Sequence, residues 1–176
     1  MTVDKIIHSK EFLVFLDNAK KFCSFLEFHK SNTSNEFLCN IQKMLVDLYL
    51  YGITLPEFEL PKNEDIEEIR IADEDIKEIS SFIEDRIGDP FYWIVVHPKD
   101  HTDNKSVCGD LVDDLGDIYK DLKTFLHGIE DSDDDVKQNT LWHLKWSFDN
   151  HWNDHSINAI YAIHYFLKQN SQKYGC

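Results

Sequence analysis

The chain has 176 residues, and its 33 acidic and 18 basic side chains give a formal net charge of −15 at neutral pH. A chain this acidic is repelled by phosphate backbones and by anionic lipid surfaces, so we expect no nucleic-acid partner and no membrane-surface role. Because 42% of the residues are hydrophobic and 13% are aromatic, the composition predicts a folded protein with a buried core.

The length and the absence of targeting signals favour one domain, residues 1–176, located in the cytoplasm. The N-terminus lacks the basic start and apolar run of a secretory signal, and no stretch reaches the ~20 apolar residues of a membrane span. The cysteines lie far apart without a paired spacing, which favours reduced thiols, and we expect Cys23 and Cys39 to be small core residues.

The first half of the chain is typical of long helices. Glycine and proline are sparse, and in residues 9–28 the apolar side chains recur every three or four positions. Thr33 and Glu36 fit a capping box at the start of a second helix, which Gly52 can end. A third helical pattern covers residues 73–87.

The second half combines one short extended segment with further helices. Residues 91–96 are aromatic and β-branched, and we expect a buried extended chain without a partner strand. A fourth helix is predicted for residues 110–127. One apolar stripe then runs through residues 133–169, and we expect this long helix to break near Asn153, with that residue in the left-handed conformation. The predicted fold is therefore all-α: a bundle-like array of five or six helices with one short extended aromatic segment.

An aspartate stripe marks the fourth helix. At ~100° per residue, Asp110, Asp114, Asp117 and Asp121 fall within a band about 60° wide, beside the leucine and isoleucine stripe. Like charges at this spacing repel each other, so a lysine, a histidine or a divalent metal ion would compensate them. The alternative is a solvated acidic face, but aspartate is a poor residue for a helix interior.

A second concentration of functional groups lies in residues 142–155. His151 and His155 are four residues apart, so on a continuous helix their imidazoles could face one point, as metal ligands do. Three hypotheses remain open: a structural histidine–aspartate network, a divalent-metal site, and a ligand pocket walled by tryptophans. The candidate metal ligands are Asp114, Asp117, Asp121, His151 and His155, and the candidate pocket walls are Trp146 and Trp152.

These segments resemble the signature of an uncharacterised bacterial family, the domain of unknown function 5063. The resemblance lies in residues 109–123 and in Trp146-Ser147-Phe148 followed by His151-Trp152 and His155, with weaker matches at Leu55-Pro56 and Tyr92-Trp93. It implies a compact helical domain whose biochemistry is unassigned. The positions that it marks are Asp113, Asp114, Asp117, Asp121, His151, Trp152 and His155. The family usually carries glycine where this chain has Asn153.

The sequence favours a non-catalytic cytoplasmic module that binds a ligand or a protein partner and uses the aspartates and histidines as a structural network. The alternative is a divalent-metal-dependent hydrolase, with the same residues as ligands and an aspartate as base. A divalent metal ion is the cofactor that these residue types allow. The sequence identifies no catalytic residue and leaves the oligomeric state open.

Overall fold

Most of the described residues lie in helices. The computed structural model describes residues 3–28, 33–61, 66, 69–95, 99, 102 and 105–173. The helices are α1 (Val3–Ile7), α2 (Lys10–Phe28), α3 (Ser34–Gly52), α4 (Asp73–Ile87), α5 (Leu111–Ile129), α6 (Asp134–Ser147) and α7 (Asn153–Lys173), with a π-helical turn, η1 (Phe148–Trp152), between the last two. The strands are β1 (Phe91–Val95) and β2 (Ser106–Asp110).

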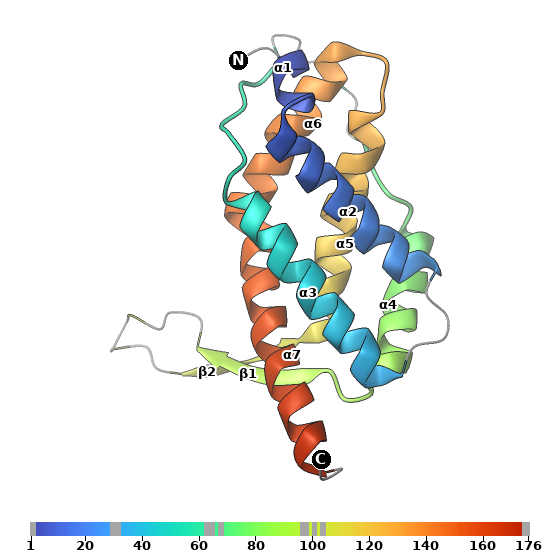
Figure 1. Cartoon of the computed structure of the whole chain (residues 1–176), viewed down its shortest axis with the longest axis vertical. Coiled ribbons are helices and arrows are strands. Elements are labelled where there is room, and N and C mark those ends of the chain that lie inside the picture. The colour runs from blue at the N-terminus through green and yellow to red at the C-terminus, as the bar shows by residue number, and fades with distance from the viewer. Residues whose placement is uncertain are drawn as a thin grey trace.

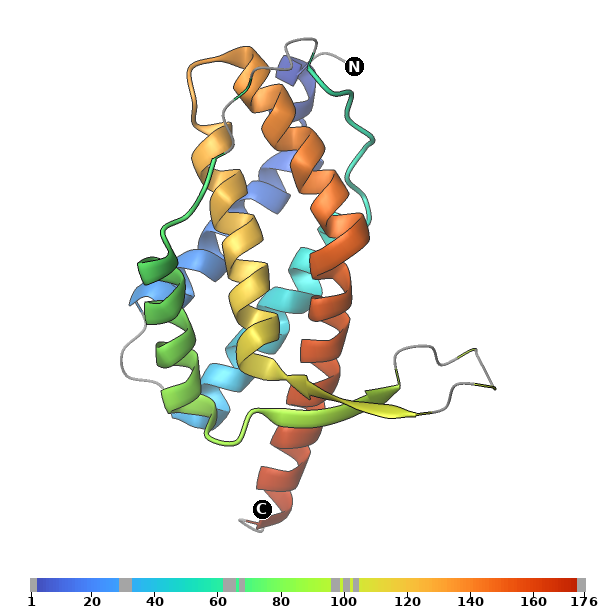
Figure 2. The same ribbon diagram turned by 180° about the vertical axis from the view of Figure 1, so that it is seen from behind.

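The long helices pack into a bundle. Helices α2 and α3 cross one face diagonally (Figure 1), and Figure 2 shows α5 and the continuous α6–η1–α7 helix on the other face. Helix α5 packs against α2, α4, α6 and α7, and α3 packs against α2 and α7. The small sheet crosses one end of the bundle, where β2 leads into α5. The predicted all-α, bundle-like class is confirmed.

Polar side chains fix the starts of the helices. Thr33 Oγ1 accepts a hydrogen bond from the Glu36 N–H (3.3 Å), and the Glu36 carboxylate accepts one from the Thr33 N–H (3.2 Å), so the predicted capping box is present. The Asp110 carboxylate accepts a hydrogen bond from the Val112 N–H (2.8 Å) at the start of α5. Asp110 therefore caps the helix that carries the other aspartates of the stripe.

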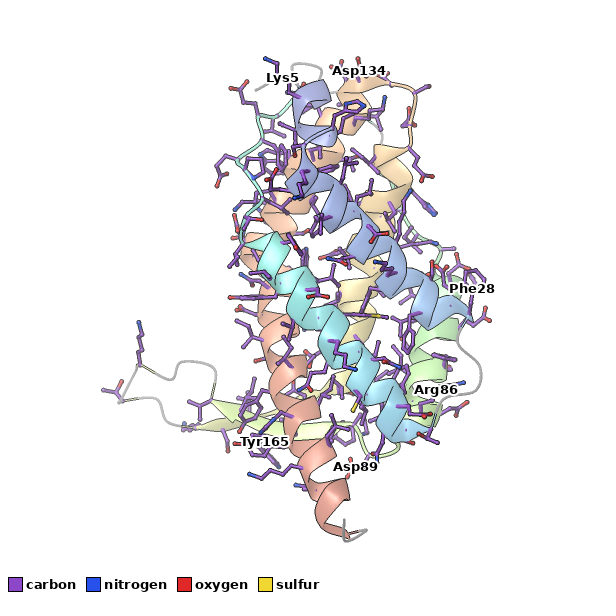
Figure 3. All side chains as sticks on the ribbon, viewed as in Figure 1. Lys5, Phe28, Arg86, Asp89, Asp134 and Tyr165 are labelled. Carbon is purple, nitrogen blue, oxygen red and sulfur yellow. The ribbon has the colours of Figure 1, made fainter. Side chains whose placement is uncertain are left out.

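Side chains fill the space between the helices (Figure 3), and many of the buried ones are aromatic. The ring centroids of Phe12 and Phe15 of α2 lie 6.0 and 5.8 Å from that of Phe125 of α5. Cys23 is buried, as predicted, but Cys39 is exposed. The prediction for Cys39 was wrong because the buried residues of α3, which include Phe37, Leu38 and Ile41, lie on another face of that helix.

The expected unpartnered, buried extended segment is wrong in two respects. Strand β1 pairs antiparallel with β2, with Tyr92 opposite Gly109, and within β1 only Tyr92 is buried. Phe91 and Trp93 lie on the opposite side of the strand and are exposed. The partner strand has the sequence Ser-Val-Cys-Gly-Asp, which lacks an alternating apolar pattern and so gave no strand signal. Val96 lies outside the described residues.

The predicted helix break near Asn153 is also wrong. Asn153 has φ −65° and ψ −42°, and its N–H donates to the carbonyl of Phe148, five residues back. The helix therefore continues through one widened turn. Polar side chains around this turn bond to backbone carbonyls four residues back: Asn150 Nδ2 donates to Trp146 O and Ser156 Oγ to Trp152 O, both at 2.8 Å. Asn153, where the break was expected, likewise donates from Nδ2 to Asp149 O (3.5 Å), so these polar side chains bond to the backbone of an unbroken helix.

Candidate metal centre

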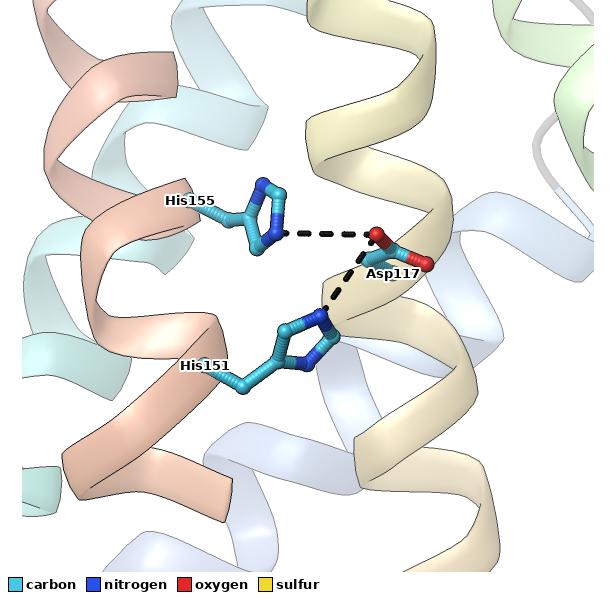
Figure 4. A group of neighbouring side chains, drawn as sticks. All are labelled: Asp117, His151 and His155. Carbon is cyan, nitrogen blue, oxygen red and sulfur yellow. Dashed lines mark ion pairs between the residues drawn. The ribbon is translucent and has the colours of Figure 1, made fainter.

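Asp117 of α5 faces two histidines of the neighbouring helix. His151 lies in η1 and His155 in the first turn of α7, and both rings point across to α5 (Figure 4). The Asp117 Oδ2 atom lies 3.5 Å from His155 Nε2 and 3.7 Å from His151 Nε2. The two imidazole centroids are 4.8 Å apart. The helical spacing therefore brings the two rings to one carboxylate.

The other ring nitrogen of each histidine meets a different carboxylate. His155 Nδ1 lies 2.7 Å from Asp114 Oδ1, and His151 Nδ1 lies 2.8 Å from Asp121 Oδ2. Because an ionised carboxylate only accepts hydrogen bonds, each Nδ1 carries the proton and donates it. In the neutral imidazole the lone pair then belongs to Nε2, which is the atom that faces Asp117.

Asp114 connects the centre to the small sheet. Its carboxylate is buried, and its second oxygen accepts a hydrogen bond from the Tyr92 hydroxyl of β1. Burial and this hydrogen bond both raise the pKa of Tyr92, so the phenol stays protonated and remains the donor. Sequence reasoning did not identify Tyr92 as a site residue, since its signals were a place in an aromatic segment and a weaker match to the family pattern.

Burial and charge act together on the titratable groups. The hydrogen bond with Asp114 raises the pKa of His155, against the opposing effect of burial. Burial raises the pKa of Asp121, although the hydrogen bond with His151 opposes this shift. Burial and the charge of Asp117 raise the pKa of Asp113, one helical turn before Asp117. The cluster therefore concentrates negative charge in a partly desolvated space, where a cation is stabilised.

The spacing of Asp117, His151 and His155 fits a divalent transition-metal ion. One ligand atom from each lies within 4.8 Å of the other two. Around tetrahedral zinc, with bonds of about 2.0–2.1 Å, neighbouring ligand atoms lie about 3.4 Å apart, close to the two nitrogen–oxygen distances given above. The five candidates thus come together in two groups, with Asp117, His151 and His155 facing one point and Asp114 and Asp121 behind the histidines.

The two tryptophans occupy different surroundings. Trp146 lines a cavity of about 470 Å³, to which Asp121 also contributes. Trp152 is fully buried in the core, with its ring centroid 4.7 Å from that of Phe148, and is not among the residues lining that cavity. The structure therefore does not bring Trp146 and Trp152 together as two walls of this cavity.

The fold and the centre define a class: a helical bundle with a carboxylate–histidine cluster between two of its helices. The family model described as "Domain of unknown function (DUF5063)" matches residues 6–169, and the chain belongs to this family. The crystal structure of protein BF1032 from Bacteroides fragilis is similar to this chain, with a TM-score of 0.76 and 22% sequence identity. The similarity covers 90% of this chain and 93% of that chain, and it shows that the two share a fold.

A search of the curated proteins found no match. Within the described ranges, no helix combines the length and the apolar character needed to cross a membrane.

Proposed function

We propose that this protein binds a divalent transition-metal ion through Asp117, His151 and His155 and uses the ion to activate water for hydrolysis. The observation that carries the proposal is the orientation of the two imidazoles. Both turn Nε2 toward the Asp117 carboxylate while a separate carboxylate holds each Nδ1. Two histidines and one carboxylate are a common ligand set for zinc and for other first-row metals.

The outer carboxylates support this assignment. Metal-binding histidines usually donate their second N–H to a carboxylate or carbonyl, which fixes the ring and raises the basicity of the ligating nitrogen. Asp121 would do this for His151, and Asp114, itself held by Tyr92, would do it for His155. Metal binding would then require little rearrangement of the rings.

The ligand number favours catalysis over a purely structural metal site. Three protein ligands leave a coordination position for water, and a bound zinc ion lowers the pKa of that water to about 7. Asp114 and Asp121 hold the histidine Nδ1 atoms. We therefore assign the role of base to Asp113, which lies one helical turn before Asp117 on α5. The raised pKa of Asp113 suits a carboxylate that accepts a proton during a reaction.

A second candidate function rests on the same contacts. Each nitrogen of His151 and His155 already lies within 4.0 Å of a carboxylate oxygen, so the cluster also satisfies itself as a network that joins α5, η1, α7 and β1. In that case the protein is a non-catalytic binding module, with a protein partner. Under either hypothesis we place it in the cytoplasm, consistent with the free thiols of Cys23, Cys39 and Cys108.

Metal titration separates the two functions. Protein stripped with a chelator is titrated with Zn²⁺ and, separately, Mn²⁺ in a calorimeter at about pH 7.5. We expect one ion per chain, and a loss of roughly 100-fold or more in affinity for Asp117→Asn and His151→Gln because each removes a ligand. His164→Gln is the matched control, since His164 is an exposed histidine of α7 outside the cluster.

A lack of metal binding would overturn the hydrolase hypothesis. If neither ion binds and neither raises the melting temperature, the cluster is a structural network. In that case His155→Ala would still destabilise the protein strongly without any metal, because it leaves the buried Asp114 carboxylate without its histidine partner.

A further inference from the structure

A cavity lies beside the proposed metal centre, between α5 and α6, and Asp117, His151 and His155 are not among the residues that line it. Its volume is about 470 Å³, and residues of α5, of α6 and of the segment before α4 line it. Asp121 lines this cavity and also holds His151 Nδ1 at 2.8 Å. On the other helix Ser147 lines it, four residues before His151. Ser147 is therefore about one helical turn, ~5.4 Å along the axis, from His151, and Asp121 joins the cavity wall to the Nδ1 side of the His151 ring.

The cavity has an apolar interior and charged groups toward solvent. Phe125 and Leu144, which line it, are only 3% and 2% exposed. Lys120 and Arg70 also line it and are exposed. Among the described residues, the carboxylates in the lining are Asp73, which is exposed, and Asp121, which is engaged with His151.

This lining suits a small molecule with an apolar body. The volume lies within the range of about 300–1,000 Å³ typical of small-molecule pockets, and Trp146 adds an aromatic surface at the wall. Lys120 directly precedes Asp121 on α5 and lines the same cavity, so it supplies positive charge at that end of the cavity. A divalent ion held by Asp117, His151 and His155 would add two further positive charges at that end.

We propose that this cavity binds the apolar part of a small organic acid whose acidic group reaches the metal ion. The proposal rests on the metal-binding function above and identifies the ligand class of that site. Three observations support the proposal. Asp121 lines the cavity and also holds His151, the interior of the cavity is apolar, and cationic side chains lie at its edge. Such side chains are few in this chain, which has only 18 basic residues.

Two hydroxamic acids test the proposal, because they coordinate zinc through the same group and differ only in their apolar body. 3-Phenylpropanohydroxamic acid has an arm long enough to carry its ring across one helical turn, whereas acetohydroxamic acid has only a methyl group. We expect the zinc-loaded protein to bind the phenyl compound about tenfold or more tightly, because its ring is buried in the cavity. Calorimetric titration measures both affinities.

Substitutions that fill the cavity give the specificity control. Ser147→Phe places a ring in the cavity, and Ser81→Phe makes the same change on the exposed surface of α4. We expect Ser147→Phe to abolish the preference for the phenyl compound while zinc and acetohydroxamic acid bind as in the unchanged protein. Ser81→Phe should retain the preference. Thr124→Phe fills the cavity from α5 and provides the second variant if Ser147→Phe folds poorly.

The outcomes distinguish this inference from the function on which it rests. If zinc binds but both hydroxamic acids bind equally, the cavity does not serve the metal centre, and this inference alone is overturned. The same conclusion follows if the preference persists in both cavity-filling variants. If zinc does not bind at all, the metal-binding function fails and the assignment of the cavity fails with it.

Discussion

The three aspartates of the cluster are the same residue type on one helix, yet the fold gives them different surroundings. The side chains of Asp114 and Asp121, which hold the histidine Nδ1 atoms, are 7% and 20% exposed, whereas that of Asp117 is 32% exposed. Buried carboxylates are held in place by their hydrogen bonds and so orient their partners well. The more accessible Asp117 faces the point where a metal ion and its ligand would enter.

The hydrogen bond from Tyr92 to Asp114 should contribute measurably to stability. Tyr92→Phe removes the hydroxyl donor and leaves one oxygen of a buried carboxylate without its partner. Because hydrogen bonds to charged groups contribute about 1.5–3 kcal/mol, we expect the free energy of unfolding to fall by about 2 kcal/mol. Urea denaturation of the metal-free protein measures this difference. The control is Tyr161→Phe on the surface of α7, where Tyr161 is 46% exposed. Equal effects of the two substitutions would contradict the assigned role of Tyr92.

The buried thiol of Cys23 predicts a pH dependence of stability. Burial, with a smaller effect of the Glu27 charge, raises the pKa of Cys23 from 9.0 to about 12. In the unfolded chain the thiol ionises as the pH rises through 9.0, while in the folded protein it stays neutral. The unfolded state is therefore favoured progressively above pH 9.0, at a cost to stability of about 1 kcal/mol near pH 9.5.

Urea denaturation at about pH 7.5 and about pH 9.5 measures this loss of stability. The Cys23→Ala variant should lack the part of the loss that comes from ionisation of this thiol. Iodoacetamide gives an independent readout in the native protein. The exposed Cys39 and Cys108 should be alkylated while Cys23 is protected. Rapid alkylation of Cys23 under native conditions would contradict the prediction.

At the scale of elements, local signals predicted the helices well. Helix α2 begins at Lys10 and ends at Phe28, within one residue of the predicted span, because an apolar face every three or four residues is encoded locally. The start of α3 was equally predictable, since the two residues of its capping box lie three positions apart. Such features depend only on residues within one or two helical turns, so they can be predicted from a single sequence.

The pairing of β1 with β2 was not predictable from local signals. The partner strand is short and polar, and its role depends on contact with a segment about 15 residues earlier. The glycine of this strand, Gly109, is required by a contact with Tyr92, a residue that is distant in sequence. A Cβ atom at this position would lie 2.4 Å from the Tyr92 ring, so only glycine allows the ring to cover the strand. Tyr92 thereby reaches Asp114, a contact that no spacing in the sequence indicates.

The candidate site was predictable in part. Helical spacing grouped the aspartates on one face and the two histidines on another, and all five residues are neighbours in the structure. In the structure Asp117 faces the Nε2 atoms, whereas Asp114 and Asp121 hold the Nδ1 atoms. This division depends on how α5 and α7 are rotated against each other. That rotation follows from packing and from the π-helical turn at Phe148–Trp152, where the sequence had suggested a break.

Charge is the dominant property of the whole molecule. Residues 110–135 hold ten acidic and two basic side chains, so much of the excess lies on and after the helix that carries the candidate centre. Some acids are paired across elements: Lys123 Nζ lies 2.6 Å from Glu27 Oε1, and Lys20 Nζ lies 3.0 Å from Glu130 Oε1. Both pairs join α2 to α5 or its C-terminal end, and they oppose the repulsion between the acidic surfaces.

The balance between repulsion and pairing predicts how salt affects stability. Raising KCl from about 20 mM to about 500 mM shortens the screening length from roughly 20 Å to roughly 4 Å, which weakens the long-range repulsion of a −15 charge more than it weakens the short pairs. We therefore expect the free energy of unfolding of the metal-free protein to rise, by an amount on the order of 1 kcal/mol. Urea denaturation at the two salt concentrations measures the change, and NaCl in place of KCl controls for specific ion binding. A fall in stability would instead show that the Lys20–Glu130 and Lys123–Glu27 pairs outweigh the repulsion.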